Sequence, residues 1–291
     1  MYKIFLLLLF SFILFTGCSQ ENEKEITIST NQWIGYAPLF YAYEKGYLDK
    51  LNIKIINNVS LAEAAELYRV GKANMVTTTQ HEYNMLKHET QDIIPIILLD
   101  RSNGGDMVLS NKSIQELHSA DKIYVYLEVD SINQEIIRDF IKHNGLDIKK
   151  MTFINQDQQQ IQDVKFKKNR ATLIVTYTPY NIHLEKKGFF EVASTKNIDA
   201  IIVIDALCTT SELLKHDKKR LLALKRSIDK SIDVIMKDPK ASHQIIKKYI
   251  SNMSYREYLT SLDSIKWINK PSKELLNYIS DLDYKEEYII Q

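Results

Sequence analysis

The segment ITISTNQWIGYAPLFYAYEKG, from Ile26 to Gly46, contains the pattern that decides the fold class. Its β-branched start, Ile26–Thr30, predicts a strand, and a polar and aromatic loop, Asn31–Tyr36, follows it. Pro38 and Gly46 then mark a helix, because proline fits the first turn and glycine fits the residue after the last turn. A loop between the carboxyl end of a strand and a helix N-terminus is where open α/β sheets bind small molecules.

Two aromatic residues of this loop, Trp33 and Tyr36, allow two interpretations. Their flat apolar faces could stack on a planar or apolar part of a ligand, or they could be core residues. Asn31 adds hydrogen-bonding groups, and Gly35 would let the backbone approach a ligand closely. All four are therefore candidate ligand-binding residues, with the core interpretation of the aromatics left open.

Strand patterns alternate with helix patterns along most of the chain. Capping boxes at Ser60–Glu63 and Ser113–Glu116 predict two helix starts, and the segment after Lys218 carries only helix signals. Further strands are expected at Ile53–Asn57, Asn74–Val76, Ile93–Leu99, Met107–Ser110, Lys122–Leu127, Met151–Asn155, Leu173–Thr176 and Ile201–Ile204, the last of them ending at Asp205. The alternation predicts an α/β fold with mixed sheets, helices on both faces and a helical C-terminal tail.

The order of these elements suggests two α/β lobes that the chain connects twice. We expect one crossing near Asn103–Asp106, where glycines interrupt a strand pattern, and the other near Thr195–Ala200. Residues 26–105 and 200–291 would then form lobe 1, with the helical tail wrapped around it, and residues 106–199 would form lobe 2. A hinge between two lobes lets a protein close around a ligand.

The N-terminal residues predict export and a lipid anchor. Met1–Lys3 is weakly basic, Ile4–Phe15 is almost wholly apolar but too short for a membrane span, and Thr16-Gly17-Cys18 follows. A cysteine after two small residues looks like a bacterial lipoprotein cleavage site, although Phe15 stands where leucine is usual. We expect residues 1–17 to be a signal peptide and residues 18–25 a tether with the lipid on Cys18, which would hold an exported domain at the periplasmic or extracellular face. An ordinary signal with a chance cysteine is the alternative.

Charge and motif content argue against several function classes. The 291 residues include 38 Lys and Arg against 37 Asp and Glu, with no basic stripe of interleaved aromatics, so a nucleic-acid partner is not expected. The sequence contains no nucleophile elbow, no HExxH and no phosphate-binding loop, which argues against an enzyme. It also lacks CxxC and His/Cys clusters, so no metal or cofactor is expected. Cys208, without a partner once Cys18 is acylated, is expected to be a small buried residue.

Several motifs resemble the type II extracytoplasmic solute-binding proteins of ABC importers, the group that includes nitrate, sulfonate, taurine and thiamine-pyrimidine binders. The resemblance rests on Trp33–Leu39, the Gly71–Asn74 turn, Asp100–Asp106 and Tyr177–Tyr180, and it extends over the mature chain. It implies a two-lobe periplasmic-binding-protein-like fold. It also implies a monomeric lipoprotein that captures a small solute between its lobes and delivers it to ABC permease subunits. The alternative is a lipoprotein of the same fold that senses a ligand and reports to a membrane signalling protein.

The loop that opens the second-lobe helix departs from this family. Glu128-Val129-Asp130-Ser131 stands where a glycine-serine pair is common. Two carboxylates disfavour a nitrate- or sulfonate-like anion, because like charges repel, and favour a nitrogen-bearing solute. Asp130 is expected to cap the helix, so the inference depends mainly on Glu128.

The remaining candidate ligand-binding residues follow strands or lie at the expected hinge. For the threonines and the hinge residues, capping and turn chemistry are alternatives to ligand binding, and Asp205 could instead form hinge hydrogen bonds. These candidates are Thr78, Thr79, Gln80, Ser102, Asn103, Asp106, Glu128, Ser131, Asn133, Tyr177, Tyr180 and Asp205.

Overall fold

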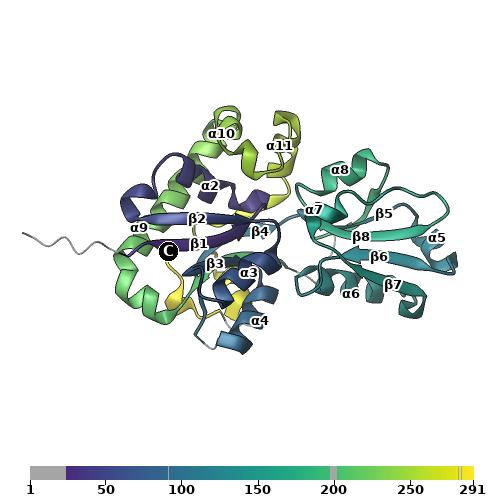
Figure 1. Ribbon diagram of the computed structural model, residues 1–291, viewed down its shortest axis with the longest axis horizontal. Helices are drawn as coiled ribbons and strands as arrows, with labels where there is room; N and C mark the ends of the chain where they lie inside the picture. Colours follow the sequence, from purple (N-terminus) through teal and green to yellow (C-terminus); the bar gives the residue numbers. More distant parts are fainter. Residues whose placement is uncertain (1–23, 91, 197–201, 281, 283) are drawn as a thin grey trace, which may run out of the picture.

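Two mixed β-sheets, each covered by helices, lie side by side along the long axis of the molecule (Figure 1). The structure is a computed structural model that describes residues 24–90, 92–196, 202–280, 282 and 284–291. The predicted signal peptide, Cys18 and most of the predicted tether lie outside the described residues. Within the described residues, every helix is too short or too polar to cross a membrane.

The first sheet begins with the opening segment of the chain. Among the described residues its strands are, in sheet order, β11 (Ile265–Trp267), β4 (Ile94–Ser102), β10 (Ile204–Thr209), β3 (Met75–Thr78), β1 (Ile26–Asn31) and β2 (Ile53–Asn58). β1 pairs in parallel with β2 and β3, which helical crossovers connect, whereas β10 runs antiparallel to β3 and β4. The carboxyl ends of β1 and β3 and the amino end of β10 therefore meet at one edge of the sheet.

Helices cover both faces of the first sheet. They are α2 (Ala37–Glu44), α3 (Leu61–Arg69), α4 (Gln80–Thr90), α9 (Ser211–Lys237), α10 (Pro239–Ile246), α11 (Tyr255–Leu262) and α12 (Lys273–Ser280), with short 3-10 helices η1 (Ile34–Tyr36), η2 (Asp49–Leu51), η4 (Lys247–Tyr249) and η5 (Glu286–Tyr288). α2 packs with α9 and α10 over one face, and α3 packs with α4 over the other (Figure 1). Each face accordingly has its own apolar core, one containing Leu39 and Leu224, the other Tyr83 and Ile279.

Two expectations for the C-terminal half are wrong. The last predicted strand does not end at Asp205: β10 begins at Ile204, and Asp205 is its second residue. All residues of β10 are buried between β3 and β4, so the strand carries no alternation of polar and apolar residues that a sequence pattern could reveal. The tail is also not wholly helical, because β11 pairs with the edge of β4. Three residues are too few for a periodic strand signal.

The second sheet is built from the middle of the chain. Among the described residues its strands are, in order, β7 (Met151–Asn155), β6 (Ile123–Leu127), β8 (Ala171–Tyr177), β5 (Asp106–Ser110) and β9 (Phe190–Ser194). The helices of this part are α5 (Ile114–Ser119), α6 (Asn133–His143), α7 (Gln158–Ile161), α8 (Asn181–Lys186) and the 3-10 helix η3 (Ile148–Lys150). Successive residues of β5 face opposite cores: Val108 packs with the α6 side, and Met107 and Leu109 pack with the α7 and α8 side.

The chain passes from the first sheet to the second between β4 and β5, and it returns between β9 and β10. Ser102 holds the two connecting segments together: its Oγ lies 2.8 Å from Thr195 Oγ1 and accepts a hydrogen bond from the Asp106 amide at 3.1 Å. The return passage includes residues outside the described ranges. The lobe boundaries expected at 105/106 and 199/200 stay a prediction.

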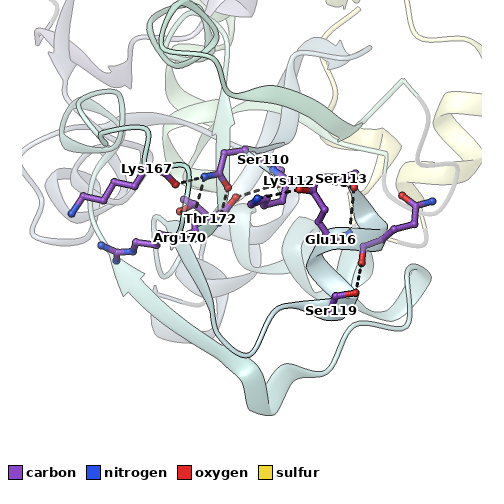
Figure 2. A network of polar contacts seen from close by, with 10 residues as sticks. Ser110, Lys112, Ser113, Glu116, Ser119, Lys167, Arg170 and Thr172 are labelled. Carbon is purple, nitrogen blue, oxygen red and sulfur yellow. Dashed lines mark hydrogen bonds and ion pairs between the residues drawn. The ribbon is translucent and has the colours of Figure 1, made fainter.

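Polar contacts fix the end of β5 that lies away from the first sheet (Figure 2). Asn111 Nδ2 donates to the carbonyls of Lys167 and Arg170, both at 2.9 Å, and its Oδ1 accepts from the Thr172 amide at 2.9 Å. The predicted capping box of Ser113 and Glu116 then begins α5. These contacts hold the connection between β5 and α5 against the start of β8 and the loop before it.

Candidate functional site

A small cavity lies where the two sheets meet. The space in it that water can reach is about 10 Å³, roughly the room of one water molecule. Its lining residues are Asn31, Trp33, Tyr36, Leu61, Thr79, Asp106, Tyr177 and Asp205. The strand topology explains why these residues converge: β1 and β8 end here, β5 and β10 begin here, and Thr79 directly follows β3.

Two buried aspartates of the first sheet lie together beside the cavity. Asp205 and Asp100 are paired residues in the antiparallel register of β10 and β4. The Tyr36 hydroxyl donates to Asp205 Oδ1, and the Trp33 indole Nε1 donates to Asp100 Oδ1 at 3.1 Å and Oδ2 at 3.3 Å. Burial raises the pKa of both carboxyls well above the usual range, and the charge of Asp100 raises the pKa of Asp205 further.

Gly35 allows this arrangement to form. A Cβ at this position would lie 2.1 Å from Asp100 Oδ2 and 2.3 Å from Trp33 Nε1. Its carbonyl accepts a hydrogen bond from the Trp267 indole at 2.8 Å. The close approach that the structure shows at Gly35 is therefore to the Trp33–Asp100 pair, and Gly35 does not line the cavity.

Asp106 and Tyr177 form the second-sheet side of the cavity. They are paired residues in the antiparallel register of β5 and β8. Asn31 Nδ2 donates to the Tyr177 hydroxyl at 3.1 Å, which joins the end of β1 to the second sheet. Asp106 Oδ2 and Asn31 Oδ1 are buried and have no hydrogen-bond partner among the described residues. Burial raises the pKa of Asp106 to about 7.

The aromatic residues around the cavity belong to the core and to the lining at the same time. Trp33 and Tyr36 are buried in the core of the first sheet and also line the cavity, so the two interpretations of these residues are compatible. Trp33 and Tyr177 meet edge to face, with ring centroids 5.8 Å apart and an interplanar angle of 86°. Tyr177 and Tyr180 meet in the same way at 5.4 Å and 80°. The walls therefore present flat rings at fixed angles.

Two glutamates next to the cavity connect the two halves of the molecule, which are the part built on the first sheet and the part built on the second sheet. Glu82 Oε1, on α4, accepts from the Ile132 amide at 3.1 Å. Glu128 Oε1, after β6, accepts from the Ala62 amide of α3 at 3.4 Å, while its Oε2 has no partner among the described residues. Burial raises the pKa of Glu128 to about 7. Glu128 therefore has a contact that joins the halves, and it does not line the cavity.

The structure brings seven of the predicted candidate residues together at the cavity and places the others nearby in structural contacts. The seven are Asn31, Trp33, Tyr36, Thr79, Asp106, Tyr177 and Asp205. Capping was the alternative role for Thr79, and the structure shows this role too. Thr79 Oγ1 accepts a hydrogen bond from the His81 amide at 3.1 Å, at the start of α4. That these residues bind a ligand stays a prediction.

The candidates outside the lining have protein partners. Thr78 Oγ1 lies 3.2 Å from the sulfur of Cys208, which is buried as expected. Gln80 Nε2 donates to the Ile202 carbonyl at 2.8 Å, and Gln80 Oε1 accepts from the Ile204 amide at 3.2 Å. Ser102 and Asn103 lie at the passage between the sheets, Ser131 and Asn133 at the start of α6, and the Tyr180 hydroxyl lies 3.5 Å from the Val59 carbonyl.

The expected helix cap at Asp130 is wrong. Asp130 is exposed and has a φ of +58°, and α6 begins at Asn133. A left-handed turn, which aspartate tolerates, carries the chain past Asp130 before the helix starts. Ser131 Oγ instead accepts from the Asn133 amide at 3.2 Å.

Sequence reasoning missed two residues of the site, Asp100 and Leu61. Asp100 directly follows the buried run that ends at Leu99, and an acidic residue at the carboxyl end of a buried strand was the signal available. Leu61 directly follows the N-cap Ser60 and has no polar group to single it out. Among the described residues, no group of three or more His, Cys, Asp or Glu side chains is arranged to hold a metal ion.

Comparisons with known proteins agree with this architecture. The family model described as NMT1/THI5 like matches residues 33–242. No curated protein matches the sequence significantly. The fold is similar to that of the ligand-binding component of an ABC-type import system from Staphylococcus aureus, solved with zinc bound (TM-score 0.70, 16% identity, 92% of this chain and 97% of that chain).

Two further solved structures have a similar fold. One is the periplasmic aliphatic sulphonate binding protein SsuA from Escherichia coli, with a TM-score of 0.70 and 11% identity over 90% of this chain and 91% of that chain. The other is the periplasmic nitrate-binding protein NrtA from Synechocystis, with a TM-score of 0.63 and 11% identity over 80% of this chain and 68% of that chain. The fold is thus that of periplasmic binding proteins.

Proposed function

The chain belongs to the NMT1/THI5-like family, and from this membership we propose that it is the solute-binding component of an ABC importer. In this proposal it captures a small organic solute between its two halves and delivers it to permease subunits. The proposal includes export and a lipid on Cys18, for which the apolar run and the small residues before the cysteine are the support.

The observation that carries the proposal is the shared lining of the cavity. Asn31 and Asp205 come from the first sheet, Asp106 and Tyr177 from the second, and a solute between them would contact both halves at once. Such a solute stabilises the closed arrangement because it adds contacts that only this arrangement offers. The similar folds named for import, sulphonate and nitrate binding support the same role.

The experiment is a thermal-shift screen followed by an uptake measurement. The panel contains pyrimidines, purines, flavins, amino acids, polyamines, sulfonates and nitrate. A compound at a hundredfold its dissociation constant adds about 2.7 kcal/mol to the free energy of unfolding. Cells that lack the protein should lose uptake of the compound that binds. A binder whose uptake does not depend on the protein would contradict the import role.

A matched pair of variants locates the binding. Tyr177→Phe removes the hydroxyl that accepts from Asn31 at the cavity. Tyr258→Phe removes a buried hydroxyl outside the lining that has no partner among the described residues. We expect only the first to weaken the binder found in the screen. Equal effects of the two variants would place the binding elsewhere.

The lipid anchor has its own test. Cys18→Ser should abolish incorporation of labelled palmitate and move the protein from the membrane fraction to the soluble exported fraction. Because Cys208 is buried, a Cys208→Ser variant is the matched control and should keep the label. Retention of the label by the Cys18→Ser variant would contradict the anchor.

A further inference from the structure

The cavity contains hydrogen-bond acceptors that the described part of the chain leaves unsatisfied. Asp106 is 4% exposed and Asn31 is 0% exposed. Asp106 Oδ2 and Asn31 Oδ1 both lack a partner there, and the Asn31 amide nitrogen is already engaged by the Tyr177 hydroxyl. Buried acceptors of this kind are costly unless a donor reaches them. A solute that binds against this lining must therefore bring hydrogen-bond donors.

The carboxyl groups around the cavity have no cationic partner among the described residues. Asp106 and Asp205 line it, and Asp100 is paired with Asp205 on the neighbouring strand. None of the ion pairs formed within the described ranges involves any of the three. A cation with N–H donors would favour the ionised form of these carboxyls and satisfy their oxygens, whereas an anion would oppose their ionisation further.

The walls favour a planar organic cation over a metal ion. The described residues contain no arrangement of three or more His, Cys, Asp or Glu side chains that fits a metal. Trp33 and Tyr177 instead line the cavity with aromatic rings that meet edge to face, and aromatic walls favour flat organic cations. The space that water can reach in this arrangement is about 10 Å³, so the two sheets must move apart to admit a solute between these walls.

We infer that the solute of this protein is a small planar cation of the amidinium or guanidinium type, whose N–H groups donate to Asp106 and Asn31 and whose charge Asp106 and Asp205 balance. The inference rests on the proposed solute-binding function and specifies the chemical class of the solute. It separates this chain from the structurally similar proteins named for sulphonate and nitrate binding.

Three isosteric probes test the charge directly. Benzamidinium, benzamide and benzoate share one planar skeleton and are cationic, neutral and anionic respectively. Their affinities are measured by calorimetry on the full chain in detergent at pH 8, where Asp106, with a pKa raised to about 7, is mostly ionised. We expect benzamidinium to bind at least tenfold more tightly than benzamide, and benzoate to show no binding.

Two Asp→Asn variants test whether the cation binds beside Asp106. Asp106→Asn removes the charge at the cavity, and we expect it to weaken benzamidinium at least tenfold while changing benzamide little. Asp233→Asn, at an exposed position on α9, is the matched control and should leave all three affinities unchanged. Circular dichroism and a thermal melt show that each variant is folded before binding is compared. Should Asp106→Asn fail to fold, Asp205→Asn serves as the second variant with the same expectation.

Several results would overturn the inference. Tighter binding of benzoate, nitrate or methanesulfonate than of benzamidinium would do so, and it would leave the proposed binding function intact. Binding of calcium or zinc that is lost in the Asp106→Asn variant would also overturn the inference, because the cavity would then hold a metal ion and not an organic cation. Absence of binding by all three isosteres would overturn it as well, and the uptake measurement then decides separately whether the proposed function stands.

Discussion

Asp205 and Asp100 face each other as paired residues of β10 and β4, and each accepts a hydrogen bond from a different aromatic residue of one loop, Tyr36 and Trp33. The loop that follows β1 therefore supplies the donors for two buried carboxyls of the same sheet. Mutual repulsion and burial oppose ionisation of these carboxyls, while the two donors favour it. The stability of the fold, the protonation of the two carboxyls and the preference for a ligand should consequently all depend on these aspartates and their aromatic partners.

Asp106→Asn should change the pH dependence of the stability of the ligand-free protein. Burial raises the pKa of Asp106 from its ordinary value of about 3.8 to about 7, and the charge of Glu82 adds to the rise. A raised pKa means that the contribution of this group to stability is full below pH 3.8 and is lost as the pH rises through 7. The variant should match the parent near pH 4 and be more stable at pH 8, by roughly 1.4 kcal/mol per unit of pKa difference.

Denaturant unfolding at pH 4, 6 and 8 measures this effect. Asp233→Asn, at an exposed position on α9, should give a curve parallel to that of the parent at every pH. If Asp106→Asn also stays parallel to the parent, the carboxyl of Asp106 is not protonated on burial.

Tyr36→Phe should destabilise the protein at neutral pH. The change removes the hydroxyl that donates to Asp205, and a buried acceptor left without its donor costs about 1–3 kcal/mol. Urea unfolding compares it with Tyr258→Phe, which removes a buried hydroxyl that has no partner among the described residues. The control should change the free energy of unfolding by less than about 1 kcal/mol. Similar losses in both variants would mean that the Tyr36–Asp205 contact contributes nothing specific.

Gly35→Ala should disrupt the contact between Trp33 and Asp100. The new methyl group would lie 2.1 Å from Asp100 Oδ2, so the carboxylate or the indole must move, at a cost of about 1–3 kcal/mol. The intrinsic fluorescence of the two tryptophans, Trp33 and Trp267, which both contact this position, should change together with the melting temperature. Gly71→Ala is the control, because no atom lies within 4 Å of its Cβ and only backbone strain at a φ of +71° opposes it. An unchanged fluorescence spectrum in Gly35→Ala would contradict the tight packing described here.

Glu82→Ala should favour an open arrangement of the two halves. Glu82 Oε1 accepts from the Ile132 amide across the boundary, so the change leaves that amide without its acceptor. Small-angle X-ray scattering of the ligand-free variant should give a larger radius of gyration than the parent. Glu89→Ala changes an exposed glutamate on the same helix and should leave the radius unchanged. A radius identical in Glu82→Ala and the parent would show that this contact does not hold the halves together.

Local patterns were sufficient to predict most elements because their signals lie within a few residues. The strand and helix after Ile26, the N-cap at Ser60, the capping box at Ser113 and the amphipathic helix α6 each follow from neighbouring side chains. The capping box predicted at Ser60 is formed only in part, because Glu63 accepts from the Val59 amide. β11 and the true extent of β10 could not be predicted in this way, because pairing with β4 decides both of them. Asp130 is not a cap for a local reason, because a left-handed turn at that residue moves the helix start to Asn133.

The sequence alone determined the alternation of strands and helices, the resemblance to solute-binding proteins and seven side chains of the cavity lining, because strand ends and aromatic loops are local features. Only the tertiary structure decided that Asp100 is paired with Asp205, that Asp106 is paired with Tyr177, and that Glu128 contacts α3 outside the lining. These relationships join residues that are far apart along the chain. They arise from strand pairing and from the packing of one sheet beside the other, and neither can be read from the few residues around each side chain.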